Sequence, residues 1–81
     1  MIHIHFFAQL RERLDCTNLN LDYAGEETVA DLKKNLIERG NKWQWLDEQQ
    51  VLIAVNQTLC GLDTPISDED EIAFFPPVTG G

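Results

Sequence analysis

The sequence predicts one α+β domain in which a mixed sheet packs against a single main helix. Residues 2–7 and 71–75, near the two ends of the chain, alternate in a way that is typical of strands with one buried face. Between them, the apolar residues of segment 28–40 recur at helical spacing. With 81 residues, 43% of them hydrophobic, the chain is long enough to bury one core.

The part of the chain before the helix is expected to contain two strands. Residues 2–7 form the first strand, and residues 18–23 form a second whose alternation suits antiparallel pairing with the first. Segment 8–15 between them is compatible with a helical turn or with a loop. Gly25 then marks a turn.

The main helix has clear start and stop signals. Thr28 and Asp31 have the spacing of a capping box, and Gly40 is typical of a helix end. The apolar residues that fall on one face of this helix are Val29, Leu32, Leu36 and Ile37. We therefore expect this face to cover the sheet.

The second half of the chain is expected to hold a short helix and the remaining strands. The helix is expected at residues 43–49, with Trp43 and Trp45 at the edge of the core, and the strands at residues 51–55, 58–62 and 71–75, with a turn at Asn56-Gln57. The apolar run 51–55 predicts a strand buried on both faces. If the first and last strands pair in parallel, this order of elements is typical of the ubiquitin-like β-grasp fold.

The last six residues are expected to form an extended tail, so that residues 1–75 are the β-grasp domain and residues 76–81 lie outside it. The two prolines at the start of the tail fix their own φ and keep the preceding residue extended. Flexibility returns at residues 79–81. Fully extended, the tail spans about 20 Å, enough to deliver the Gly81 carboxylate into a pocket of another protein.

The charge of the chain limits the class of partner. Fourteen acidic and six basic residues give a net charge of −8, which opposes nucleic acids and anionic membranes and favours a basic protein partner. Cys16 and Cys60 have no metal-ligand or redox-motif spacing, so free thiols in a reducing compartment are expected. No stretch approaches the about 20 apolar residues that span a bilayer, and a cytoplasmic protein is predicted.

No catalytic or metal site is expected from the side chains of this chain. His3 and His5 share one strand face, but no third ligand stands at a recognisable spacing. The acidic run 68–71 offers too few ligands at fixed positions for a calcium loop. The sequence also lacks a Ser/His/Asp or Cys/His arrangement and a glycine-rich phosphate loop.

Three segments carry a family resemblance that spans nearly the whole chain. They read FFAQLRE at residues 6–12, AVNQTL at 54–59 and FFPPVTGG at 74–81. On these motifs the chain resembles the small subunit of molybdopterin synthase (MoaD), a family of ubiquitin-like sulfur carriers. The C-terminal block is the most specific part, because a Gly-Gly end alone also fits ubiquitin-like modifiers and the thiamine sulfur carrier.

The resemblance implies a carrier that is not an enzyme alone. An E1-like adenylyltransferase (MoeB-type) uses ATP to adenylate the Gly81 carboxylate, and a sulfur donor then displaces AMP to leave a thiocarboxylate. In the large synthase subunit, this sulfur passes to cyclic pyranopterin monophosphate during molybdenum cofactor biosynthesis. The family precedent is a heterotetramer of two small and two large subunits. The chain itself is expected to bind no cofactor.

The candidate site residues divide into a tail and a docking patch. Gly81 would carry the sulfur, and the residues that would enter the partner with it are Gly80, Thr79, Val78, Pro77 and Pro76. If Ile72 and Phe74 point inward, alternation turns Phe75 outward, and the same parity turns Phe7 outward on the first strand. With Leu59, these two phenylalanines form the predicted docking patch.

One position departs from the family pattern. The turn before the last strand usually reads Asp-Gly-Asp in this family, and Glu69 stands in the glycine position, where a positive φ would be mildly strained.

Three alternative functions stay open. The chain would be a sulfur carrier for thiamine or another thiolation pathway, or a ubiquitin-like modifier joined to lysines through Gly81. A non-covalent binding module would tolerate loss of Gly81.

Overall fold

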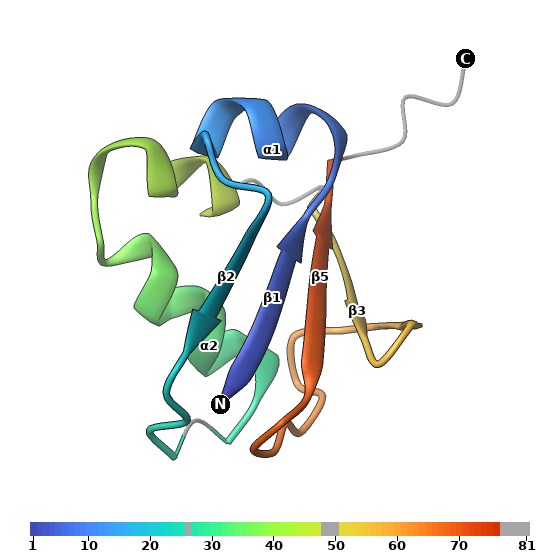
Figure 1. The fold of residues 1–81 in the computed structure, drawn as a ribbon. Coiled ribbons are helices and arrows are strands. Elements are labelled where there is room, and N and C mark those ends of the chain that lie inside the picture. The colour runs from blue at the N-terminus through green and yellow to red at the C-terminus, as the bar shows by residue number, and fades with distance from the viewer. Residues whose placement is uncertain (26, 48–50, 77–81) are drawn as a thin grey trace.

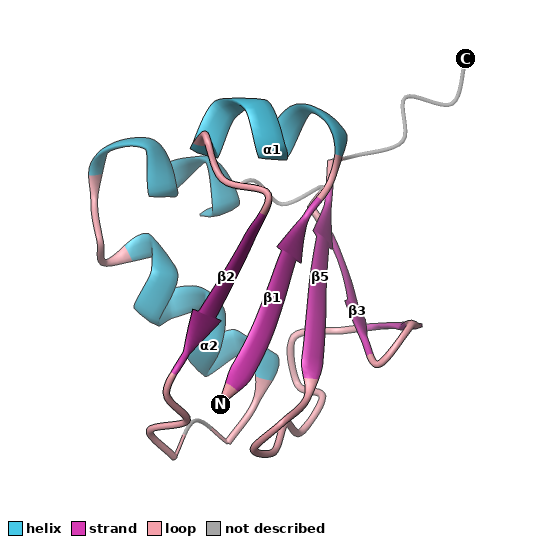
Figure 2. Cartoon of the chain, in the orientation of Figure 1, coloured by secondary structure: helices cyan, strands magenta, loops and turns pink. Residues whose placement is uncertain are grey.

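The computed structural model describes residues 1–25, 27–47 and 51–76, which form a mixed sheet with helices on one side (Figures 1 and 2). The five strands lie in the order β2-β1-β5-β3-β4. In chain order the elements are β1 (Ile2–Phe6), α1 (Ala8–Leu14), β2 (Asn18–Leu21), α2 (Val29–Ile37), the 3₁₀ helix η1 (Asn41–Asp47), β3 (Leu52–Val55), β4 (Thr58–Cys60) and β5 (Glu71–Phe75). The predicted α+β architecture is confirmed.

The centre of the sheet is the parallel pair of the first and last strands (Figure 1). β1 aligns with β5 so that Ile4 lies opposite Ile72 and Phe6 lies opposite Phe74. β2 adds antiparallel to β1, and β3 adds antiparallel to the other edge of β5. The antiparallel second strand, which the alternation favours, is confirmed, and the terminal strands pair in parallel, as the β-grasp interpretation requires.

The core lies between the sheet and the helices. Phe6 and Phe74 stack with ring centroids 5.7 Å apart, and Trp43 of η1 packs on Phe6 at 5.8 Å. The side chains that are almost completely buried are Ile2, Ile4, Phe6, Leu10, Leu14, Val29, Leu32, Leu36, Leu46, Ile72 and Phe74. Trp43 therefore covers the edge of the core as predicted, whereas Trp45 lies largely exposed beneath the Arg13 guanidinium.

The signals that delimit the main helix act as the sequence indicates. The Thr28 side chain accepts a hydrogen bond from the Asp31 amide, and the Asp31 carboxylate accepts one from the Thr28 amide, which completes the capping box. Gly40 follows the helix at φ +80°, a left-handed conformation that suits glycine. Asn56 and Gln57 also have positive φ, as a tight hairpin between β3 and β4 requires.

Several predicted boundaries were wrong. Segment 8–15, for which a helical turn and a loop were both left open, contains the helix α1, because Leu10 and Leu14 fall on one buried face. β2 ends at Leu21 and β4 at Cys60, each two residues earlier than expected. The short second helix is a 3₁₀ helix that begins at residue 41, and residues 48–50 lie outside the described part of the chain.

The prediction that the strand at 51–55 is buried on both faces was also wrong. Ile53 faces the core, but Leu52 is exposed on the opposite face of β3. The reason is that the helices cover only one face of this sheet (Figure 2). A continuous apolar run is therefore not sufficient to show a second covering layer.

The turn before β5 ties three parts of the fold together through Glu69. This residue has φ +74°, so it occupies the left-handed region that the sequence comparison with Asp-Gly-Asp turns suggested. Its carboxylate contacts the Met1 ammonium, which also contacts Asp68, and it lies 3.2 Å from Nε2 of His3. Nδ1 of His3 lies 3.0 Å from Oδ1 of Asn20 on β2. Both neighbours are acceptors, so the ring donates from both nitrogens when it is protonated.

These contacts change the titration of the groups involved. The hydrogen bond to Glu69, followed by the one to Asn20, raises the pKa of His3 above its ordinary value of about 6.5. The same hydrogen bond lowers the pKa of Glu69. The His3–Glu69 pair therefore stabilises the fold below the ordinary histidine pKa, and this contribution is lost as pH rises through the raised value. At low pH it is lost as Glu69 becomes protonated.

Two leucines test the separation between core and open face. Replacing buried Leu36 with alanine is expected to lower the free energy of unfolding by about 2–5 kcal/mol, since it removes packing contacts and leaves a cavity. The same change at Leu59, which is 66% exposed, is expected to cost less than about 0.5 kcal/mol. Urea denaturation of both variants measures the difference. Equal losses would contradict the assignment of Leu59 to the surface.

The Glu69 contact can be tested by the substitution Glu69→Gln. We expect the pKa of His3 to fall toward its ordinary value, because the neutral amide no longer favours the charged imidazolium. NMR titration of the ring protons measures this shift. The matched substitution Glu38→Gln, in the C-terminal cap of α2, should leave the His3 titration unchanged. An unchanged His3 pKa in the Glu69 variant would show that the carboxylate is not its partner.

Candidate functional site

The candidate site is the face of the sheet that the helices leave open. Its residues follow from strand register: one row across the sheet runs from His5 through Ala73 and Ala54 to Leu59. In the neighbouring row Phe75 pairs with Leu52. Because alanine side chains are short, the middle of this face is lower than its surroundings.

Phe7 and Phe75 form one wall of the resulting hollow. Their rings stack with centroids 4.7 Å apart and planes inclined by only 10°. Phe75 points away from the core, whereas Ile72 and Phe74 are completely buried, as alternation along the last strand predicts. Phe7 follows the end of β1 and is 43% exposed. The sequence therefore identified both aromatic residues and the face on which they lie.

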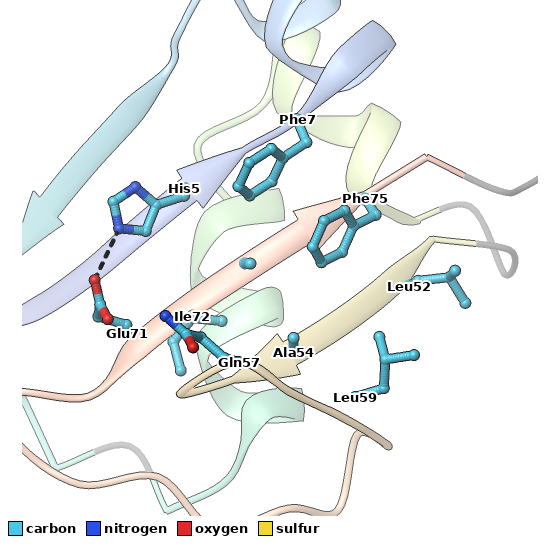
Figure 3. A pocket seen from close by; sticks show the side chains of 10 residues that line it. His5, Phe7, Leu52, Ala54, Gln57, Leu59, Glu71, Ile72 and Phe75 are labelled. Carbon is cyan, nitrogen blue, oxygen red and sulfur yellow. Dashed lines mark hydrogen bonds and ion pairs between the residues drawn. The ribbon is translucent and has the colours of Figure 1, made fainter.

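The hollow has a volume of about 630 Å³ (Figure 3). It is lined by His5, Phe7, Leu52, Ala54, Gln57, Leu59, Glu71, Ile72, Ala73 and Phe75. Leu59 rises from β4 on the side opposite the two phenylalanines (Figure 3). The structure thus brings together the three residues of the predicted docking patch, which are far apart in the sequence. A contiguous exposed apolar area of this kind is typical of a surface that another protein covers.

One end of the hollow is polar. Nε2 of His5 lies 3.4 Å from Oε1 of Glu71, and both side chains are partly exposed (Figure 3). Gln57, in the hairpin turn, lines the same end. The two phenylalanines lie at the other end, where β5 finishes. The polarity of the open face therefore changes along β5: the face is acidic and polar where the strand begins and apolar where it ends.

The sequence interpretation assigned three of the ten lining residues to the docking patch and did not assign the other seven, among them three that form the apolar floor and edge of the hollow. Leu52 and Ala54 belong to β3, and Ala73 belongs to β5. Counting back two residues from Phe75 would have identified Ala73. The two β3 residues depend on the register that pairs Leu52 with Phe75, which the uniformly apolar run does not specify.

The tail begins at the apolar end of this face. Pro76 follows directly after β5 and is half-buried. The other residues predicted to enter a partner, Pro77, Val78, Thr79 and Gly80, and the predicted sulfur attachment point Gly81, lie outside the described residues. Their roles stay predictions, as does the division of the chain at residue 75.

The described ranges 1–25, 27–47 and 51–76 hold neither a metal site nor a membrane-spanning helix. In these ranges no three His, Cys, Asp or Glu side chains gather in a way that would hold a metal ion. Cys16 and Cys60 are free thiols, and Sγ of Cys16 lies 3.2 Å from the carbonyl oxygen of Asn18. None of the helices in these ranges is long and apolar enough to cross a membrane.

Known proteins resemble this chain both in sequence and in fold. Residues 4–81 match the model of the ThiS family. The molybdopterin synthase sulfur carrier subunit of Haemophilus influenzae is 44% identical over 84 aligned positions, which cover all of both chains. The crystal structure of SAMP1 from Haloferax volcanii superposes with a TM-score of 0.81 at 25% identity, covering 99% of this chain and 98% of that one.

A further solved structure contains a relative together with a second subunit. It is the complex of subunits 1 and 2 of the molybdopterin-converting factor from Helicobacter pylori, matched with a TM-score of 0.68 and 28% identity over 99% of this chain and 97% of that one. These similarities and the confirmed strand order establish the ubiquitin-like β-grasp fold. The chain belongs to the ThiS family and, within it, to the molybdopterin synthase sulfur carrier subunits of the MoaD type.

Proposed function

We propose that this chain carries sulfur on its Gly81 carboxylate to the large subunit of molybdopterin synthase. The observation that carries this proposal is the apolar half of the open sheet face, which ends where the Pro76 tail begins. A partner seated on this face would receive the last residues of the chain. The Helicobacter pylori relative, which was solved with its second subunit, supports such a pairing.

The carrier step is a two-stage exchange at the terminal carboxylate. The Gly81 carboxylate attacks the α-phosphate of ATP on an E1-like, MoeB-type adenylyltransferase, and pyrophosphate leaves. A sulfide-level sulfur donor then attacks the carbonyl carbon of the acyl adenylate, the C–O bond to AMP breaks, and a thiocarboxylate remains. Its sulfur passes to cyclic pyranopterin monophosphate, with the catalytic side chains supplied by the large subunit. The chain binds no cofactor in this scheme, and we propose that it acts in the cytoplasm.

The division between body and tail has an energetic reason. Ordering each tail residue costs on the order of 1–2 kcal/mol of conformational entropy, and glycines offer little contact area in return. Affinity must therefore come largely from the folded body. The stacked Phe7–Phe75 pair and the exposed Leu59 supply apolar area that becomes buried when a partner covers the hollow. We extend the family precedent of two small and two large subunits to this chain.

Two related functions share the same terminal chemistry. The similarity to SAMP1, a small archaeal modifier protein, supports a second candidate, in which Gly81 is joined to lysines of target proteins. Sulfur carriage to another acceptor, in the thiamine pathway or another thiolation pathway, is compatible with the match to the ThiS family. Isopeptide conjugates in a cell lysate would favour the modifier, and thiamine auxotrophy of a deletion strain would favour the second pathway.

Intact mass spectrometry tests the chemistry of the terminus. After incubation with the activating enzyme, ATP and a sulfur donor, the chain is expected to gain roughly 16 Da, since one oxygen is exchanged for sulfur. A chain without Gly81 should gain nothing, although its fold is intact by circular dichroism. If the full-length chain also gains nothing from an activating enzyme that thiolates another carrier, the sulfur-carrier proposal is wrong.

A matched leucine pair tests the docking surface. Leu59→Asp places a charge in the hollow and is expected to weaken binding to the large subunit at least about tenfold. Leu62→Asp changes an exposed leucine that does not line the hollow and should bind as the unmodified chain does. Isothermal titration calorimetry measures both. Equal affinities of the two variants would place the docking surface elsewhere.

A further inference from the structure

The hollow has an acidic end, where β5 begins, in addition to its apolar patch. Glu71 opens β5 and lines the hollow, and its side chain is 54% exposed. The run 68–70 directly before it is also acidic, but Asp68 and Glu69 are paired with the Met1 ammonium, and Asp70 accepts hydrogen bonds from Asn56 and Ser67. Phe7 and Phe75 of the predicted docking patch lie at the opposite end, near the tail, whereas Leu59 lies across the sheet on β4. The two ends of one face therefore differ in charge.

The backbone of Glu71 is held firmly in place. Its amide donates to Oδ1 of Asn56 at 3.0 Å, and its carbonyl accepts from the Asn56 amide at 2.8 Å. Nδ2 of Asn56 donates in turn to Asp70 at 3.1 Å. These bonds join the hairpin turn to the start of β5. The Glu71 side chain therefore extends from a fixed backbone position at the rim of the hollow.

Covering the hollow would remove water from this carboxylate. Among the described residues, the side-chain contact of this carboxylate is with His5, whose Nε2 approaches one carboxylate oxygen at 3.4 Å, a long distance for a charge-assisted hydrogen bond. A single long contact cannot replace the hydration of two carboxylate oxygens, and a buried carboxylate without adequate partners is costly. A partner that fits this surface must therefore bring a donor to Glu71.

We propose that Glu71 is a specificity-determining residue, which receives an arginine or lysine of the large subunit when that subunit covers the hollow. This inference rests on the proposed function. An arginine suits the position because its planar guanidinium donates to both oxygens of a carboxylate. The apolar contact at Phe75 and the ionic contact at Glu71 lie at opposite ends of β5, so together they fix the direction in which the partner lies relative to the tail.

The test is the binding of the large subunit from the same organism to three variants, measured by calorimetry at low and high ionic strength. Glu71→Gln keeps the shape of the side chain but removes its charge, and it is expected to weaken binding about tenfold at low ionic strength. Glu71→Asp keeps the charge and should recover most of the affinity. Glu38→Gln removes a charge in the C-terminal cap of α2, away from the hollow, and should change affinity less than about twofold.

Salt provides a second readout, since a charge contact is screened whereas apolar burial is not. The unmodified chain should lose affinity with salt more steeply than the Glu71→Gln variant. The proposal is overturned if Glu71→Gln and Glu38→Gln bind equally well. If Leu59→Asp still weakens binding in that case, the docking surface of the proposed function stands without an ionic contact at Glu71. If Leu59→Asp has no effect either, the docking surface lies elsewhere and the proposal for Glu71 fails with it, whereas sulfur carriage is decided separately by the mass of the terminus.

Discussion

The parallel pairing of β1 with β5 is the constraint on which the rest of this structure depends. It joins the two ends of the chain at the centre of the sheet and aligns Phe6 with Phe74 in the core. Because parallel strands finish at the same edge, Phe7 and Phe75 emerge side by side and stack. The tail leaves from this edge. A single strand pair thus builds the core on one face and the aromatic wall of the candidate site on the other.

Coverage of only one face by helices has a functional as well as a structural effect. The helices bury Ile72 and Phe74, while the opposite face keeps Leu52 and Leu59 exposed. The small side chains of Ala54 and Ala73 form the floor between them, so the hollow results from side-chain size and not from a gap between elements. The same β-grasp architecture therefore provides stability through one face and leaves the other for binding.

Much of this arrangement could be predicted from sequence, because alternation reports directly on faces. The parity of residues along the terminal strands was sufficient to place Phe7 and Phe75 outside, and the capping box and Gly40 delimited the main helix. The contribution of Leu52 could not be predicted, since an apolar run does not specify its register against β5. The 3₁₀ form of η1 and the helix α1 depend on packing against the core, which local patterns describe poorly.

The exposed apolar area lies on one half of one sheet face, and this affects the order in which two partners can bind the chain. If the activating enzyme and the large synthase subunit both bind the carrier at this surface, they compete for it and cannot bind simultaneously. The chain must then dissociate from one before it meets the other, and throughput becomes limited by how quickly each complex comes apart. A surface with the highest possible affinity would slow the dissociation of each complex. Moderate affinity at the Phe7–Phe75 wall therefore favours faster turnover than maximal affinity does.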